Sequence, residues 1–242
     1  MEFLHDHEPR SRYYRSRVPL LVLLLAGLIC ADTQAQESSG IVHFPTRERS
    51  WDRIPSITIL TAANDSRIPL VLEAVEFWNK TFAEIGTAFK LGPVEQASEI
   101  PPAPFLLKMS DAVLSRSPLP EFPETLKNTK GDLIVVLSDG DFVSFSTGFT
   151  KAGRVVVAIK SDRKSPLIYA DYPNVARNVI AYELGHAIGL GHNNDPTKLM
   201  CGRPASCRPD AFRSNTEMYF PLTEIEKAYL LKIYPPTWSP SR

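Results

Sequence analysis

A short stretch of the chain combines two histidines and a carboxylate at spacings that suit metal chemistry. Residues 181–192 read A-Y-E-L-G-H-A-I-G-L-G-H. On a helix, positions 182 and 186 lie one turn apart on the same face, and Glu183 projects about 100° round from position 182. The helix can therefore present two metal ligands and a general base together.

Gly189 allows a sharp turn after this helix, either through a positive φ or through a close backbone approach. That turn would bring His192 back as a further ligand. Three protein ligands and an open fourth position define a catalytic zinc site. Zinc would lower the pKa of its bound water to about 7, and Glu183 would accept the proton as the water attacks a peptide carbonyl. The pattern predicts metal-assisted peptide hydrolysis.

Position 182 is the unusual one, because a histidine there would complete the zinc signature H-E-x-x-H-x-x-G-x-x-H. Tyr182 leaves three interpretations open. Its phenolate could bind zinc, although its oxygen reaches ~2 Å farther from the backbone than an imidazole nitrogen does. Alternatively, the site keeps two histidines and waters, or Tyr182 is a core residue in the helical stripe that includes Val175 and Val179. His43 is expected to be a surface residue.

The elements that would position these residues follow from hydrophobic periodicity and breaker residues. Strands are predicted from Ile57, at Phe105 to Met109, at Leu133 to Leu137 and at Val155 to Ile159. A helix should start at Asp65-Ser66 and run to about Ile85, with Trp78 on its buried face. The motif helix should begin at Asp171-Tyr172-Pro173 and end at Gly189 and Gly191. A last helix, Thr223 to Tyr234, begins with the capping box of Thr223 and Glu226.

The motif residues, together with Asn193-Asn194-Asp195-Pro196 and Leu199-Met200, resemble the metzincin zinc proteases and are most similar to the matrixin branch. The resemblance is strong over 179–200 and weaker at Pro221 to Tyr234. It implies that Met200 is the methionine beneath the metal. The resemblance implies Glu183 as the general base and His186 and His192 as zinc ligands, and it puts Tyr182 in the register of the third metal ligand, where we expect it to complete the metal site.

The same resemblance implies an α/β fold: a twisted mixed sheet of mostly parallel strands with an antiparallel edge strand, two long helices and a C-terminal helix. It places the substrate-pairing edge strand around Gly153 to Ile159. The implied function is a zinc-dependent endopeptidase. The main alternative is an inactive relative that binds peptides or a partner through the same cleft, and a further one is a structural or inhibitor-like envelope protein.

Composition narrows the classes of partner. The 242 residues are 43% hydrophobic and carry 27 Lys+Arg against 27 Asp+Glu, so the formal net charge is zero. Without a basic field or a Lys/Arg cluster, nucleic acid is not an expected partner. We expect a monomer that acts on protein or peptide.

The N-terminal residues 1–35 are typical of a secretory signal peptide, with a basic n-region, the apolar run Val18 to Ala31 and a small-residue cleavage site at Ala35. That run would span only about 21 Å as a helix, too short for a membrane anchor. Residues 36–53 are predicted to be a tail and residues 54–242 the catalytic domain. The protein should be secreted, into the medium or into the periplasm or envelope of a Gram-negative bacterium.

Two further features bear on stability in that compartment. Cys201 and Cys207, the cysteines that remain after cleavage near Ala35, are predicted to form a local disulfide. Asp139-Gly140-Asp141 is a weak signal for the structural calcium that matrixins often carry, and it more often marks a turn.

Overall fold

The computed structural model describes residues 50–161, 173–202 and 217–241. Every described residue belongs to one compact unit. The predicted signal peptide lies outside the described residues. No helix within the described ranges is both long and apolar enough to cross a membrane.

A single five-stranded sheet organises the fold, in the order β2-β1-β3-β5-β4. The first four of these strands run parallel, and β4 pairs antiparallel with β5. This arrangement confirms the predicted α/β fold with a mostly parallel sheet and an antiparallel edge strand. The strands are β1 Ile57–Leu60, β2 Val94–Ala97, β3 Leu133–Ser138, β4 Phe145–Ser146 and β5 Val155–Lys160.

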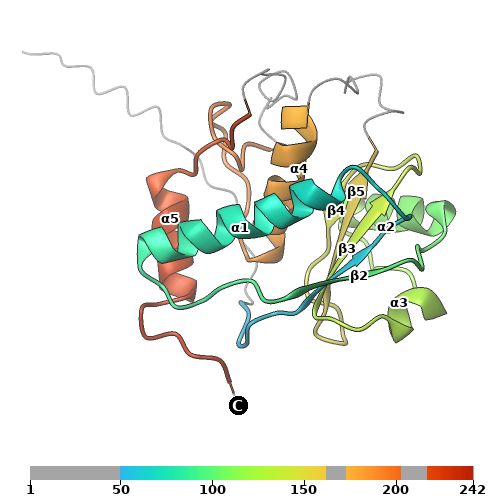
Figure 1. Ribbon diagram of the computed structural model, residues 1–242, viewed down its shortest axis with the longest axis horizontal. Helices are drawn as coiled ribbons and strands as arrows, with labels where there is room; N and C mark the ends of the chain where they lie inside the picture. Colours follow the sequence, from blue (N-terminus) through green and yellow to red (C-terminus); the bar gives the residue numbers. More distant parts are fainter. Residues whose placement is uncertain (1–49, 162–172, 203–216, 242) are drawn as a thin grey trace, which may run out of the picture. The chain divides into compact units, whose positions relative to one another are not determined.

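Helices cover both faces of the sheet, with α1, α4 and α5 on one side and α2 and α3 on the other (Figure 1). The central strand β3 is buried throughout, and alternate side chains enter the two cores: Leu133 and Val135 face α1 and α4, whereas Ile134 and Val136 face α2. The helices are α1 Ile68–Ile85, α2 Ala103–Ser115, α3 Glu124–Asn128, α4 Pro173–Ala187 and α5 Glu224–Ile233.

Most predicted elements are present. The strands that begin at Ile57, Leu133 and Val155 are confirmed, as is the long helix that buries Trp78. The capping box of α5 is confirmed, because the Thr223 side chain accepts from the Glu226 amide and the Glu226 carboxylate accepts from the Thr223 amide. Sequence reasoning missed β2, whose side chains are mostly exposed, and the five-residue helix α3.

The predicted strand at Phe105 to Met109 is wrong, because these residues lie inside α2. The apolar run F-L-L-K-M conceals a helical period, since the buried residues Leu106, Met109 and Ser110 recur at three- and four-residue spacing. Helical spacing puts these residues on one face, which packs on Ile134 in the sheet.

The prediction that the segment Gly153 to Ile159 forms the edge of the sheet is also wrong. Its residues form β5, which pairs with β3 on one side and with β4 on the other. The run V-V-V-A-I is buried throughout, as expected for an inner strand of a sheet covered on both faces. The antiparallel edge strand is β4, which the sequence did not predict.

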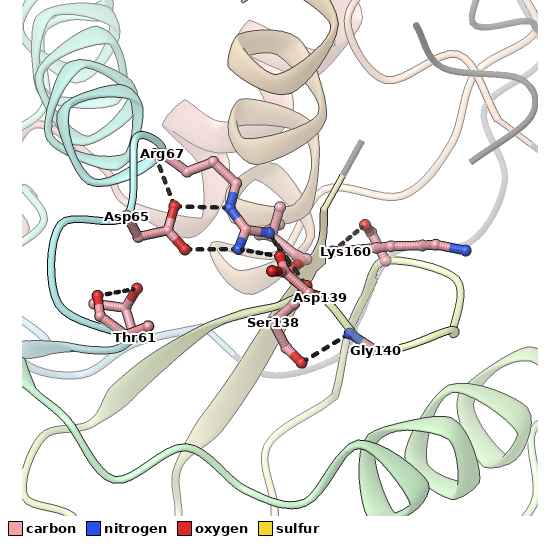
Figure 2. Close-up of polar contacts among 10 residues, drawn as sticks. Thr61, Asp65, Arg67, Ser138, Asp139, Gly140 and Lys160 are labelled. Atoms are coloured by element: carbon pink, nitrogen blue, oxygen red, sulfur yellow. Dashed lines mark hydrogen bonds and ion pairs between the residues drawn. The ribbon is translucent and has the colours of Figure 1, made fainter. Parts of the chain in front are cut away.

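A buried arginine fastens the start of α1 to the ends of two parallel strands (Figure 2). Arg67 donates from Nη1 to the backbone oxygens of Ser138 and Ile159, at 3.2 and 3.1 Å. Its Nη2 lies 2.6 Å from Asp65 Oδ2 and 3.3 Å from Asp139 Oδ1. Burial alone would raise the pKa of Asp65, but the hydrogen bonds and charge of Arg67 outweigh it and hold that pKa below its ordinary value.

This ion pair predicts a specific loss of stability in acid. A carboxyl whose pKa is depressed by folding stabilises the protein above its unfolded pKa, and this stabilisation is lost as pH falls through the folded pKa. We expect Asp65→Asn to lower the free energy of unfolding at pH 7 by about 2–3 kcal/mol, because it leaves Arg67 buried with one partner fewer. Urea titrations at pH 7 and below about pH 4 measure it, and the penalty should shrink in acid.

Asp111→Asn on the exposed face of α2 is the control and should be near neutral at both pH values. An Asp65→Asn penalty that is the same at both pH values would contradict this account.

Candidate active site

The motif lies on α4, whose buried face packs on α1. Val175, Ile180 and Leu184 are fully buried, and Trp78 of α1 donates from its indole nitrogen to the Ala181 backbone oxygen at 3.0 Å. The predicted cap residues Asp171 and Tyr172 lie outside the described residues. The packing fixes the rotation of α4, so that the opposite side of the helix is turned toward the cavity described below.

The end of α4 is a Schellman turn with Gly189 at the left-handed position, φ +112°. The Gly189 amide donates to the His186 oxygen at 3.1 Å, and the Leu190 amide donates to the Gly185 oxygen at 2.9 Å. This confirms the sharp turn predicted at Gly189. A Cβ at this position would also lie 3.1 Å from Ile233 Cδ1 of α5.

The turn brings three donor atoms together. His186 Nε2 lies 3.1 Å from His192 Nε2, and the Tyr182 hydroxyl oxygen lies 2.7 Å from the same His192 nitrogen. His186 Nδ1 lies 2.8 Å from the Leu190 oxygen. The side chains of Tyr182, His186 and His192 therefore converge, although the first and the last lie ten residues apart along the chain.

The hydrogen bond of His186 to the backbone leaves a ring lone pair that faces His192. A carbonyl only accepts, so His186 Nδ1 donates to Leu190 and the neutral ring presents the lone pair of Nε2 to His192. His192 Nε2 carries either one lone pair or one proton: as an acceptor it can take the hydrogen bond of the Tyr182 hydroxyl, and as a donor it can meet the lone pair of His186 Nε2. The 3.1 Å contact between the two ring nitrogens is therefore favourable when a proton or a cation lies between them.

The separation also fits zinc. Two nitrogens bound at ordinary length to a tetrahedral zinc ion lie about 3.3 Å apart, close to the observed 3.1 Å. In the described parts of the chain, no group of three His, Cys, Asp or Glu side chains is placed to hold a metal ion. The third donor in this cluster is a phenol, since Tyr182 turns its hydroxyl to His192 while its half-buried ring packs on the core.

A cavity of about 410 Å³ lies over these residues. Glu183 is 5% exposed and lines this cavity with the two histidines and Tyr182. The sequence-predicted site residues are therefore brought to one cavity. The rest of its wall comes from the end of α2 and from the segment that leads into β4: Val113, Leu114, Arg116, Val143, Ser144, Phe145 and Ser146.

Glycines let other parts of the chain approach the site closely. A Cβ at Gly185 would lie 2.6 Å from the Met200 sulfur, so the buried Met200 packs against α4, and its predicted place beneath a metal stays a prediction. A Cβ at Gly202 would lie 2.5 Å from the Tyr182 hydroxyl and 2.7 Å from the His192 ring. Any other residue at position 202 would displace one of these two side chains.

Asn193 anchors the loop that carries His192, and sequence reasoning missed it. Its side chain is fully buried and donates from Nδ2 to Glu226 Oε1 at 2.7 Å, while its Oδ1 accepts from the Asp195 amide at 2.8 Å. Its backbone amide donates a hydrogen bond to the Met200 oxygen, and its backbone oxygen accepts one from the Gly202 amide. The Glu226 carboxylate that caps α5 thus also holds the residue next to His192.

The predicted disulfide and the weak calcium signal have different outcomes. Cys201 is 4% exposed, but its predicted disulfide partner Cys207 lies outside the described residues, so that disulfide stays a prediction. Asp139 pairs with Arg67, and Asp141 lies 2.6 Å from the Lys160 ammonium. Each carboxylate has a cationic partner, which gives no support to a calcium ion there.

Comparisons with known proteins identify similar solved structures only. No family model matches the chain, and no curated protein matches it. The chain is similar to archaemetzincin from Methanopyrus kandleri, with a TM-score of 0.42 and 17% identity over 77% of this chain and 98% of that one. It is also similar to myroilysin, with a TM-score of 0.38 and 10% identity over 79% of this chain and 88% of that one.

The anchor at Asn193 generates a prediction about metal affinity. We expect Asn193→Ala to weaken zinc binding at least tenfold, because the loop loses its bond to Glu226 and His192 is no longer fixed against His186. Isothermal titration with zinc measures this. The matched control is Thr223→Ala, which removes the cap of α5 but leaves the bond between Asn193 and Glu226 in place.

Both variants should lose about 1–2 kcal/mol of stability, since each removes a buried hydrogen bond or a helix cap. Only Asn193→Ala should lose zinc affinity. Equal losses of affinity in the two variants would show that general destabilisation, not the loop anchor, is responsible.

Proposed function

We propose that this chain is a secreted, metzincin-type zinc endopeptidase. In this proposal His186, His192 and Tyr182 hold the metal and Glu183 is the general base. The observation that carries it is the convergence of two imidazole nitrogens and a phenolic oxygen, 3.1 and 2.7 Å apart, in a cavity that Glu183 also lines. The matrixin-like continuation after His192 supports the finer assignment, and so does the position of Met200 beneath α4.

A bound zinc ion would supply Lewis acidity toward a peptide carbonyl and would acidify a water molecule. The chain's own groups do the rest. The Leu190 oxygen holds His186 in the tautomer that points its Nε2 lone pair at the site. The Glu183 carboxylate takes a proton from the attacking water and returns it to the amine that leaves as the C–N bond breaks.

The edge strand β4 is the proposed docking element for the peptide. In the described part of the chain, β4 pairs with β5 on one side and has no strand on the other. Phe145 and Ser146 of β4 line the same cavity as Glu183. An extended peptide that adds to such an edge gains backbone hydrogen bonds and passes the site with its carbonyls in order.

The cellular setting rests on the sequence. The signal-like residues 1–35 support export, and the balanced charge supports a protein or peptide substrate and no nucleic acid. We propose that the protein acts as a secreted monomer, with a Cys201–Cys207 disulfide in the loop after Met200.

One observation favours a second candidate, a peptide-binding protein without catalysis. The Tyr182 hydroxyl lies at hydrogen-bonding distance, 2.7 Å, from the nitrogen with which His192 would bind zinc. A phenol that keeps its proton there competes with the metal. The cavity and β4 would then serve binding alone.

Metal content and proteolysis separate these two candidates. We expect about one zinc per purified chain by mass spectrometry of the metal, and cleavage of an unfolded protein substrate that a chelator stops. Glu183→Ala should keep the zinc and lower turnover by at least a hundredfold, because general-base catalysis contributes on that order.

The control is Glu84→Ala, which removes an exposed carboxylate from α1 and should leave turnover unchanged. Folded protein that neither contains nor takes up zinc would contradict the enzyme proposal. Zinc binding without cleavage in the unmodified protein would favour the peptide-binding candidate.

The role of Tyr182 is tested by Tyr182→Phe, which removes only the phenolic oxygen. If that oxygen is a ligand, as proposed, we expect zinc affinity to fall at least tenfold, in line with the loss of one donor of three. An unchanged or higher affinity would contradict ligation, because the hydroxyl would then only have occupied His192 Nε2. Tyr182→His is the companion variant and should bind zinc at least as tightly as the natural protein.

A further inference from the structure

We propose that Arg116 selects substrates with an acidic side chain next to a large apolar one. This inference rests on the proposed peptidase function and names the substrate class of the same cavity. It is carried by the position of Arg116, by its backbone conformation and by the apolar residues beside it.

Arg116 directly follows α2 and lines the same cavity as Tyr182, Glu183 and His186 of the motif helix α4. Among the described residues that line the cavity, Glu183 is the only other Asp, Glu, Lys or Arg, and the proposed chemistry assigns it the role of general base. Arg116 is exposed, and within the described ranges no carboxylate forms an ion pair with it. A guanidinium in such a place binds a carboxylate through paired N–H donors.

The backbone at Arg116 is the second observation. Three helices of the described chain end in the same Schellman turn, and Gly86 and Gly189 occupy the left-handed position of α1 and α4. The third turn ends α2, where the Ser117 amide donates to the Ala112 oxygen at 2.8 Å and Arg116 itself has φ +57°.

That conformation favours glycine and is uncommon for a long side chain. Asn64 is the other described non-glycine residue with positive φ, and asparagine tolerates it well. An arginine at a position where glycine would be less strained points to a use for its side chain.

The proposed preference for a large apolar side chain rests on two exposed apolar residues that line the same cavity as Arg116. Leu114 of α2 is 47% exposed and Val143, just before β4, is 52% exposed. Both belong to the cavity lining, where a substrate side chain would cover them. A peptide paired with β4 would thus meet an apolar surface and a cation together.

Cleavage of a peptide library derived from a whole proteome tests the selection. For the natural protein we expect cleaved sequences to be enriched in Glu and Asp at one position near the cleaved bond. Arg116→Gly should reduce that preference about five- to tenfold, the size expected for one charge-assisted contact. Because glycine suits the left-handed turn, the variant should unfold at the same temperature or higher, so a folding defect cannot mimic the result.

The matched control is Lys108→Ala, which removes a cation from the exposed side of α2 outside the cavity lining. It should leave the acidic preference intact. A cleavage profile without acidic preference, or one that Arg116→Gly leaves unchanged, would overturn the inference while the peptidase function stands.

A binding measurement keeps the inference testable if the protein does not cleave peptides. The probes are fluorescein-labelled heptapeptides that carry Glu, Gln or Lys at one central position between leucines. We expect the Glu peptide to bind about five- to tenfold more tightly than the Gln peptide, and the Lys peptide to bind most weakly. Loss of this order in Arg116→Gly supports the inference, and equal binding of the three peptides overturns it.

Discussion

The turn at Gly189 is the constraint on which the site depends. It ends α4 two residues beyond Ala187, and the same turn directs the Leu190 carbonyl to His186 Nδ1 and returns His192 to His186 Nε2. A residue with a Cβ would strain the left-handed backbone there and crowd Ile233 of α5. One glycine thus sets both the direction of the second histidine and the tautomer of the first.

The rest of the fold holds that turn in place through polar groups at the end of α4. The indole of Trp51 donates to the Ala187 oxygen at 3.0 Å, and the Tyr234 hydroxyl donates to the Ile188 oxygen at 2.9 Å. These carbonyls lie in the last turn, where a helix lacks its own donors. The two aromatic residues come from opposite ends of the described chain, so the contacts that bring these ends together also satisfy the last carbonyls of the motif helix.

The sequence predicted what periodicity and motif chemistry encode. Buried strands such as β3 can be predicted from their continuous apolar runs. The spacing of Glu183, His186 and His192 likewise predicts that these side chains lie close together. It could not predict the helix at Phe105, where a local apolar run masked the helical period, or the edge strand β4 of two residues. The hydrogen bond between Asn193 and Glu226 could not be predicted either, because it joins a loop to a helix 33 positions farther along the chain.

Tyr182 is best understood together with Gly202. A phenol is longer than an imidazole, so a tyrosine in the first ligand's register needs room beyond the point where a histidine would end. The chain supplies that room, since even a Cβ at Gly202 would lie 2.5 Å from the Tyr182 hydroxyl. Gly202 is in turn held by the hydrogen bond that its amide donates to the backbone oxygen of Asn193, the same residue that anchors the His192 loop. The tyrosine is therefore accommodated by the loop that carries its partner histidine, and exchanging Tyr182 for histidine alone would leave a gap that this loop must close.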